Sequence, residues 1–308
     1  MNATNSMPPD RGHLSTEQRH EGSQDLDALD TLACVKLMVE DHGRVQEALD
    51  AASRGLAAFI DALVEKMRDG GRLIYLGAGT SGRLGVLDAS ECPPTFQSDP
   101  GQIVGLIAGG DSALRKSSES MEDDPEGANE ELDSLEVGSK DTVLGIAAGG
   151  TTPYVLGGIK IAKTRGAMTG LLTCAPQASP PEACDHLLLL DTGPELLTGS
   201  TRLKAGSATK LALNIITTTT FTRLGKVYGN LMVDLRATND KLSDRAIRIF
   251  IELFPETTRE ESHEWLAQAH GALKLALVMK KLGVDRNEAE RRLQNNHGQL
   301  RSILGANS

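Results

Sequence analysis

Five short apolar runs, four of which end at or directly before glycine, alanine or threonine, constrain the fold of this 308-residue chain more than any other feature. Helix-length segments separate most of the runs. Parallel strands that are covered by helices on both faces are apolar throughout, so this pattern predicts an α/β protein with a doubly wound, five-stranded parallel sheet. Ligands of such folds bind at the carboxyl ends of the strands. The predicted strands are residues 73–76, 103–108, 143–148, 168–173 and 187–190.

The segments outside the sheet differ in composition. Residues 1–24 are polar and predict a flexible N-terminal arm. Residues 25–70 carry apolar side chains at helical spacing and predict N-terminal helices ahead of the first strand. The α/β domain is expected over 63–226. Residues 240–308 predict a small helical C-terminal module, with three short helices after about residue 256 that are punctuated by Gly271, Gly283 and Gly298.

Charge and composition exclude several classes of partner. The 32 basic and 42 acidic side chains give a net charge of −10, which would repel a nucleic-acid backbone or an anionic membrane. The chain has only five Phe, three Tyr and one Trp, too few for a base-stacking platform or a sugar-stacking groove. An anionic ligand would therefore be held locally, and a sugar by hydrogen bonds.

The cellular setting is predicted from the cysteines and from the apolar segments. Four cysteines without paired spacing are typical of reduced thiols rather than of a disulfide framework. We see neither a signal peptide nor an apolar run of the ~18 residues that a membrane span requires. The sequence predicts a cytoplasmic protein.

A glycine-rich turn follows the first predicted strand, with the sequence Gly77-Ala78-Gly79-Thr80-Ser81-Gly82-Arg83. Glycines let backbone amides approach an anion closely, and the start of the following helix adds unpaired N–H groups. The spacing also matches the dinucleotide motif G-x-G-x-x-G, but after the second strand an acidic residue comes only at Asp111, behind two glycines. The hydroxyls of Thr80 and Ser81 favour a phosphomonoester, and a tight turn without a ligand is the alternative.

Two further strand ends carry small and hydroxylated residues. Residues 148–153 read Ala-Gly-Gly-Thr-Thr-Pro. An anion could bind to this loop through Gly149, Gly150, Thr151 and Thr152. Alternatively, the loop binds no ligand and Thr152 merely caps the next helix. The segment 193–210 adds Ser200, Arg202 and Lys204 to further hydroxyls. Its cations, in a strongly negative chain, indicate local neutralisation of an anion, and an ordinary solvated helix start is the alternative.

Two carboxylates are candidates for acid–base chemistry. Glu91 precedes Pro93 and Pro94, which we expect to turn the chain at the end of the helix. A carboxyl group against apolar and proline surface can have its pKa raised into a useful range. Glu122 is by residue type an ordinary surface carboxylate on a predicted helix, and the residues around it do not select it.

These motifs together resemble the sugar isomerase (SIS) domain of bacterial N-acetylmuramic acid 6-phosphate etherases. The runs 77–94, 145–154 and 193–210 carry the resemblance, which extends from about Leu26 to the C-terminus and includes residues 228–234. The motif Gly-Pro-Glu-x-Leu-Thr-Gly-Ser-Thr-Arg-Leu-Lys at 193–204 is also shared with glucokinase regulatory proteins. The resemblance implies that 63–226 is an SIS domain.

The resemblance implies cleavage of the D-lactyl ether of N-acetylmuramic acid 6-phosphate to N-acetylglucosamine 6-phosphate and D-lactate, in cell-wall amino-sugar recycling. The implied route is elimination followed by hydration, without a metal or another cofactor. Glu91 matches the family's proton-donating glutamate and Glu122 its second catalytic glutamate. Phosphate binding carries over to Thr80, Ser81, the second loop and Ser200. The resemblance also implies a homodimer with a shared active site.

The second loop departs from the family pattern. These etherases commonly read Ala-Ser-Gly-Arg-Thr-Pro there, whereas residues 148–153 lack both the serine and the arginine. We expect free amides at Gly149 and Gly150 and the two threonine hydroxyls to compensate. A non-catalytic sugar-phosphate sensor and an SIS aldose–ketose isomerase are the alternatives. One SIS domain instead of two disfavours the sensor, and the 193–210 motif disfavours the isomerase.

Overall fold

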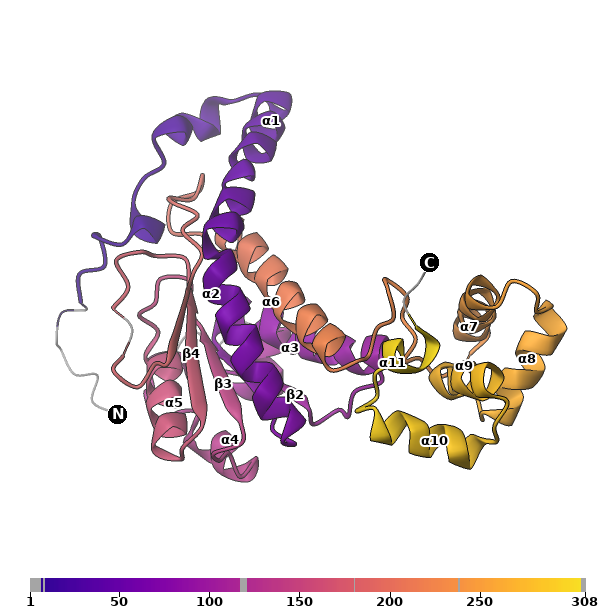
Figure 1. The fold of residues 1–308 in the computed structure, drawn as a ribbon. Helices are drawn as coiled ribbons and strands as arrows, with labels where there is room; N and C mark the ends of the chain where they lie inside the picture. Colours follow the sequence, from indigo (N-terminus) through magenta and orange to yellow (C-terminus); the bar gives the residue numbers. More distant parts are fainter. Residues whose placement is uncertain (1–6, 8, 117–120, 180, 238, 306–308) are drawn as a thin grey trace. The chain divides into compact units, whose positions relative to one another are not determined.

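The computed structural model describes residues 7, 9–116, 121–179, 181–237 and 239–305, drawn in colour in Figure 1. The chain forms two compact units. The first comprises residues 1–88 and 104–214, and the second residues 89–103 and 215–308. None of the helices in the described ranges is both long enough and apolar enough to cross a membrane.

A five-stranded parallel sheet forms the centre of the first unit, with strand order β2-β1-β3-β4-β5. All five predicted strands are confirmed to within two residues, because buried parallel strands leave an uninterrupted apolar run in the sequence. In the register, Gly77 pairs with Ile146 and Ile146 with Leu172, so the loops after β1, β3 and β4 leave the same edge of the sheet. The strands are β1 (Leu73–Gly77), β2 (Ile103–Ile107), β3 (Thr142–Ile146), β4 (Met168–Thr173) and β5 (His186–Leu189).

Helices cover both faces of this sheet, as a doubly wound fold requires (Figure 1). On one face α5 (Pro153–Thr164) packs Val155 and Ile159 against Ile74 and Leu76 of β1. On the other face lies α2 (Gly43–Arg68), whose Phe59 ring meets the His186 ring edge-on at 5.6 Å. The other helices that begin in this unit are α1 (Thr31–Asp41), α3 (Gly79–Phe96), α4 (Asn129–Ser134) and α6 (Lys204–Arg223).

Helix α3 continues through both prolines that were expected to end it. It runs to Phe96, and the N–H of Gln97 closes its last turn by donating to the Pro93 carbonyl at 2.9 Å. Prolines remove the N–H groups that would bond one turn back, but residues beyond them can still close the helix. The expected turn at Pro93 and Pro94 was therefore wrong.

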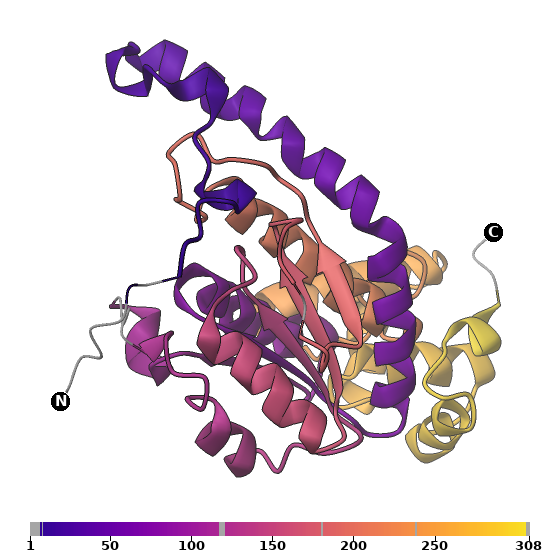
Figure 2. The same cartoon turned by 90° about the vertical axis from the view of Figure 1, so that its left-hand side faces the viewer.

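The described part of the predicted flexible arm packs on other parts of the first unit, whereas residues 1–6 and 8 of that prediction lie outside the described residues. Residues 14–28, here called the N-terminal strap, contain three short 3₁₀ turns, Ser15–Glu17, Glu21–Ser23 and Leu26–Ala28. Leu14 and Thr16 are buried, and Leu14 packs with Ala175 and Ala178. A few such contacts fix a polar segment that composition alone assigns to solvent. Figure 2 shows the strap in indigo below the end of α1.

The second unit has its own core, built around Phe250 and Leu277. The sequence predicted three helices after residue 256, and the structure has a short fourth one as well as α7 before them. Gly271, Gly283 and Gly298 all adopt positive φ between these helices, as expected for helix-ending glycines. The helices are α7 (Asp240–Leu253), α8 (Arg259–Gln268), α9 (Leu273–Leu282), α10 (Arg286–Asn295) and α11 (Arg301–Leu304).

Candidate active site

The first candidate loop is a tight strand-to-helix turn in which α3 begins only two residues after β1 ends. A Cβ on Gly77 would lie 2.5 Å from the Gly82 nitrogen, so only glycine allows the helix to start this close to the strand. Thr80 and Ser81 consequently sit in the first turn of α3 and are partly exposed. Arg83 is used locally, donating to the carbonyls of the segment after β2 at 2.7 and 3.2 Å.

The second candidate loop links β3 to α5 and is anchored to the end of β4. The Ala148 carbonyl accepts from the Cys174 N–H at 2.8 Å and from the Thr173 hydroxyl at 3.0 Å. Gly150 has φ +68°, and a Cβ there would lie 2.3 Å from that of Ala178. The Thr152 side chain makes no capping bond to α5, although Thr152 is the N-cap residue. The Thr152 hydroxyl therefore does not serve as a side-chain cap of α5 in this structure.

The third candidate segment folds around a buried carboxylate. Glu195 accepts from the N–H groups of Lys204 and Ala205 at 3.1 and 2.9 Å, so a residue nine positions earlier caps the start of α6. Burial raises the pKa of Glu195 above its ordinary value. This helix start is thus buried rather than solvated. It adjoins the first loop, since a Cβ on Gly206 would lie 3.6 Å from the Thr80 methyl group.

The cations of the third segment differ in their surroundings. Lys204 is 1% exposed, and its ammonium donates to the Asp41 carboxylate and the Pro194 carbonyl, both at 2.7 Å. Arg202 is exposed and Ser200 is partly buried. Sequence reasoning grouped Lys204 with Arg202, but in the structure the Lys204 ammonium joins the third segment to the end of α1.

Glu122 lies beside the second loop, held by its backbone. Its carbonyl accepts from the Tyr154 N–H at 3.0 Å, in the first turn of α5. The Tyr154 hydroxyl donates to Glu131 at 2.8 Å, and burial raises the pKa of that carboxyl group. Glu122 occupies a turn rather than the predicted helix, and its side chain is partly buried. The structure therefore distinguishes Glu122 from the surface carboxylates around it.

Glu91 lies on α3, three residues after Asp88. Its side chain is exposed, so the expected shielding by apolar and proline surface is not seen there. Asp88 is buried, and its carboxylate accepts from the Tyr75 hydroxyl at 2.9 Å. This bond attaches α3 to the middle of β1.

Sequence reasoning missed the N-terminal strap, which lies along the loops. The Ser15 N–H donates to the Gln177 side chain at 3.2 Å, the Ser23 hydroxyl donates to the Leu196 carbonyl at 2.8 Å, and the His20 ring lies 3.3 Å from the Asp41 carboxylate. No apolar periodicity marks this segment, because Leu14 is its main buried apolar residue. A hydrophobicity pattern could not have found it.

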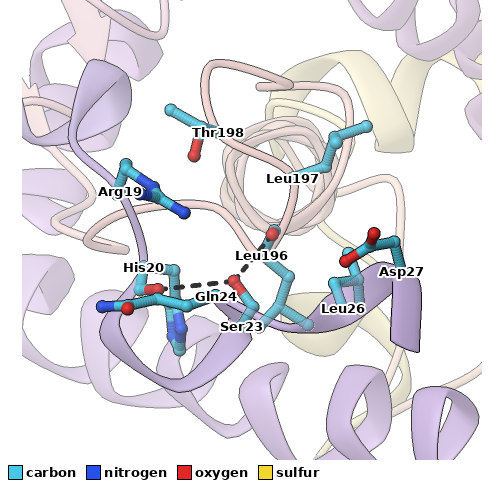
Figure 3. A pocket seen from close by; sticks show the side chains of 9 residues that line it. All are labelled: Arg19, His20, Ser23, Gln24, Leu26, Asp27, Leu196, Leu197 and Thr198. Carbon is cyan, nitrogen blue, oxygen red and sulfur yellow. Dashed lines mark hydrogen bonds between the residues drawn. The ribbon is translucent and has the colours of Figure 1, made fainter. Parts of the chain in front are cut away.

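A pocket of about 360 Å³ lies between the strap and the third segment (Figure 3). The dashed line from Ser23 to Leu196 shows that the strap is bonded to the far wall of the pocket. Its lining residues are Arg19, His20, Ser23, Gln24, Leu26, Asp27, Leu196, Leu197 and Thr198.

The fold and these loops define an SIS-domain protein. Residues 55–163 match the family model of the glucokinase regulatory protein N-terminal SIS domain. The solved structure of a phosphoheptose isomerase from Francisella tularensis shares the fold, with a TM-score of 0.51, 16% identity and coverage of 63% of this chain and 100% of that one.

Comparison with curated proteins shows which family of SIS-domain proteins this chain resembles in sequence. An N-acetylmuramic acid 6-phosphate etherase of Synechococcus sp. (strain CC9605) is 52% identical over 96% of this chain and 94% of its own. One of Rubrobacter xylanophilus is 50% identical over 96% of this chain and 97% of its own. The chain belongs to the N-acetylmuramic acid 6-phosphate etherase family.

Proposed function

We propose that this chain is an N-acetylmuramic acid 6-phosphate etherase, a carbon–oxygen lyase that releases D-lactate and N-acetylglucosamine 6-phosphate. The observation that carries the proposal is the 52% identity to an etherase over 96% of the chain. The same protein would serve cell-wall amino-sugar recycling. A cytoplasmic location is part of the proposal, since thiols stay reduced there, and none of the chain's four cysteines forms a disulfide among the residues that the structure describes.

The reaction proceeds by elimination and then hydration. Opening of the sugar ring gives an aldehyde at C1, which acidifies the proton on C2. Loss of that proton as the C3–O bond breaks expels the lactyl oxygen, and water then adds to C3 of the unsaturated aldehyde. The first half needs a base at C2 and an acid at the departing oxygen, and the second half needs the reverse transfers.

We assign these proton transfers to Glu122 and Glu91. Glu122 is the base at C2, which its place beside the second loop supports. Glu91 is the acid at the departing oxygen, and its exposure on α3 leaves the carboxyl group open to substrate. The reaction requires no metal or other cofactor, because the aldehyde itself supplies the electron sink.

The phosphate is assigned to the loops at the carboxyl edge of the sheet. Thr80 and Ser81, in the first turn of α3, offer hydroxyls and helix-start amides. Gly79 precedes them, and residues 149–152 add the amides and hydroxyls of the neighbouring loop. Ser200 and Arg202 complete the set. Lys204 is given a structural role instead, because its ammonium group already donates to the Asp41 carboxylate and the Pro194 carbonyl and so holds the third segment in place.

We also propose a homodimer whose two chains share each active site. Helix α1 has no buried residue, and Leu32, Val35 and Val39 are 63%, 52% and 71% exposed along it. Apolar side chains at this helical spacing favour a protein partner, and two-fold dimers are the commonest assembly.

The test follows the reaction in heavy water. The purified protein is incubated with N-acetylmuramic acid 6-phosphate in D₂O, and mass spectrometry follows D-lactate release and deuterium at C2. We expect both in the native protein, and losses of about 10²–10⁴-fold in kcat for Glu91→Gln and Glu122→Gln.

Glu130→Gln is the matched control, because Glu130 is an exposed carboxylate on nearby α4 and should keep native activity. Binding of the sugar phosphate without lactate release would instead indicate the sensor that the regulatory-protein match allows. Release without C2 deuterium would contradict the elimination route.

A further inference from the structure

Thr16 of the N-terminal strap carries a polar atom that its surroundings leave unsatisfied. The residue is 0% exposed, and its hydroxyl has no hydrogen-bond partner within the part of the chain that the structure describes. An unpaired buried hydroxyl costs about 1–3 kcal/mol, so buried hydroxyls in proteins are normally paired. Other buried hydroxyls, such as that of Thr142, are unpaired as well, so the surroundings of the Thr16 hydroxyl must decide whether a ligand can be its partner.

The location of the hydroxyl indicates what that partner is. A Cβ on Gly149 would lie 3.5 Å from the Thr16 Oγ1 atom and 3.8 Å from the Thr151 Oγ1 atom. Both hydroxyls therefore border the space that the missing side chain of Gly149 leaves. This is the second candidate loop, between β3 and α5.

The position of Thr16 is fixed from both sides along the strap. Before it, Leu14 is buried with Ala175 and Ala178, and the Ser15 N–H is bonded to Gln177. After it, Glu17 approaches the third segment, since a Cβ on Gly199 would lie 3.3 Å from the Glu17 carboxylate. Thr16 is thus held between the second and third loops.

We propose that Thr16 is a ligand-binding residue of this site, whose hydroxyl donates a hydrogen bond to the phosphate group of a bound phosphomonoester at the second loop. The inference rests on the proposed function for the identity of the sugar phosphate. The second loop has no cation among residues 147–153, so a neutral hydroxyl donor from another segment can add to its amides. Thr16 of the strap supplies such a side chain beside Gly149, which has none. The nearby Glu17 carboxylate repels the same anion, so the amides of the loop must outweigh it.

The test compares variants that separate the hydroxyl from the packing. Thr16→Val keeps the shape and removes the hydroxyl, and Thr16→Ser keeps the hydroxyl. Thr142→Val is the matched control, because Thr142 is also 0% exposed with an unpaired hydroxyl, but lies at the opposite end of β3. Each variant is measured for its Tm, its Kd for inorganic phosphate and its KM for N-acetylmuramic acid 6-phosphate.

Thr16→Val should raise both Kd and KM about tenfold, the effect of one hydrogen bond to a charged acceptor, and leave Tm equal or higher because an unpaired polar group is removed. Thr16→Ser should stay within about threefold of the native affinity, and Thr142→Val should leave affinity unchanged. Native Kd and KM in Thr16→Val would overturn the inference. An equal loss in Thr16→Ser would also overturn it, because packing would then explain the effect.

The phosphate titration keeps this inference separate from the proposed function. A native protein that binds phosphate through Thr16 but releases no lactate refutes the etherase assignment and leaves the Thr16 assignment standing. If the native protein releases lactate and the Thr16→Val variant keeps native Kd and KM, the etherase assignment stands and the Thr16 assignment is refuted.

Discussion

The segment that follows Glu122 packs directly against α5. At Gly157 of α5 the contact leaves no room for a side chain. A Cβ on Gly157 would be 1.8 Å from the Pro125 carbonyl oxygen. Gly157→Ala must therefore move the backbone that follows Glu122, at a cost of about 2 kcal/mol in stability. If Glu122 is the base, as proposed, kcat should fall more than tenfold while KM changes little, because displacing a catalytic group by a fraction of an ångström spoils its geometry.

Steady-state kinetics and a thermal melt check this prediction. Gly43→Ala is the control, since a Cβ there meets nothing within 4 Å at the start of α2, and it should keep native kcat and Tm. Native kcat in a folded Gly157→Ala protein would show that the position of the turn is unimportant.

Single residues were the least predictable level from the sequence. The glycine-rich loops could be recognised from their composition, but Glu122 was identified only through the family resemblance. The burial of Thr16 and Glu195 beside the candidate loops was missed, and Lys204 was grouped with the cations expected to bind an anion. In each case the role depends on a partner far along the chain, such as Asp41 for Lys204 at a separation of 163 residues, and local composition does not contain that information.

The strands β1 and β3 begin at a shared ion pair. Arg72 donates to both carboxylate oxygens of Asp141 at 2.9 Å, and Asp141 is buried. Burial alone would raise the pKa of Asp141, but the bonds from Arg72 and Gly138 outweigh it and hold the pKa below the ordinary 3.8. A carboxylate with a lowered folded-state pKa stabilises the fold above its unfolded pKa, and this stabilisation disappears as the pH falls through the folded value.

Asp141→Asn should therefore unfold more easily than the native protein at pH 7, by about 2 kcal/mol, and the difference should shrink as the pH falls below about 4. Urea unfolding across this pH range measures it. Asp244→Asn is the control, because Asp244 also has a lowered pKa from Arg259 and Arg248 but is exposed to solvent, where ion pairs contribute little. A constant difference at every pH would assign the effect to packing.

Elements were predicted better than residues. The apolar runs placed all five strands, because a strand buried on both faces needs an unbroken apolar segment. Helix ends were predicted less well. Pro93 and Pro94 were expected to end α3. They remove only two backbone N–H donors, and the N–H of Gln97 still closes the last turn.

At the scale of the whole molecule, the exposed apolar face of α1 gives a test of the proposed dimer. Val35→Glu places a charge in the middle of that face and should weaken association by at least tenfold, because an unpaired charge would have to be buried. Sedimentation velocity over a dilution series measures the dissociation, and activity should decline together with the dimer. Ala51→Glu, at an exposed position of α2, should leave the native dimer intact. A monomeric native protein with full activity would contradict the shared site.

The strap also sets an order of events during synthesis. Ser15 and Ser23 leave the ribosome well before their partners Gln177 and Leu196, which follow 162 and 173 positions later. Contacts of this sequence separation form late in folding. A nascent chain therefore places Thr16 beside the second loop only after the third segment has been translated, and a chain that stops short of it carries Glu91 and Glu122 without the bonds that hold the strap.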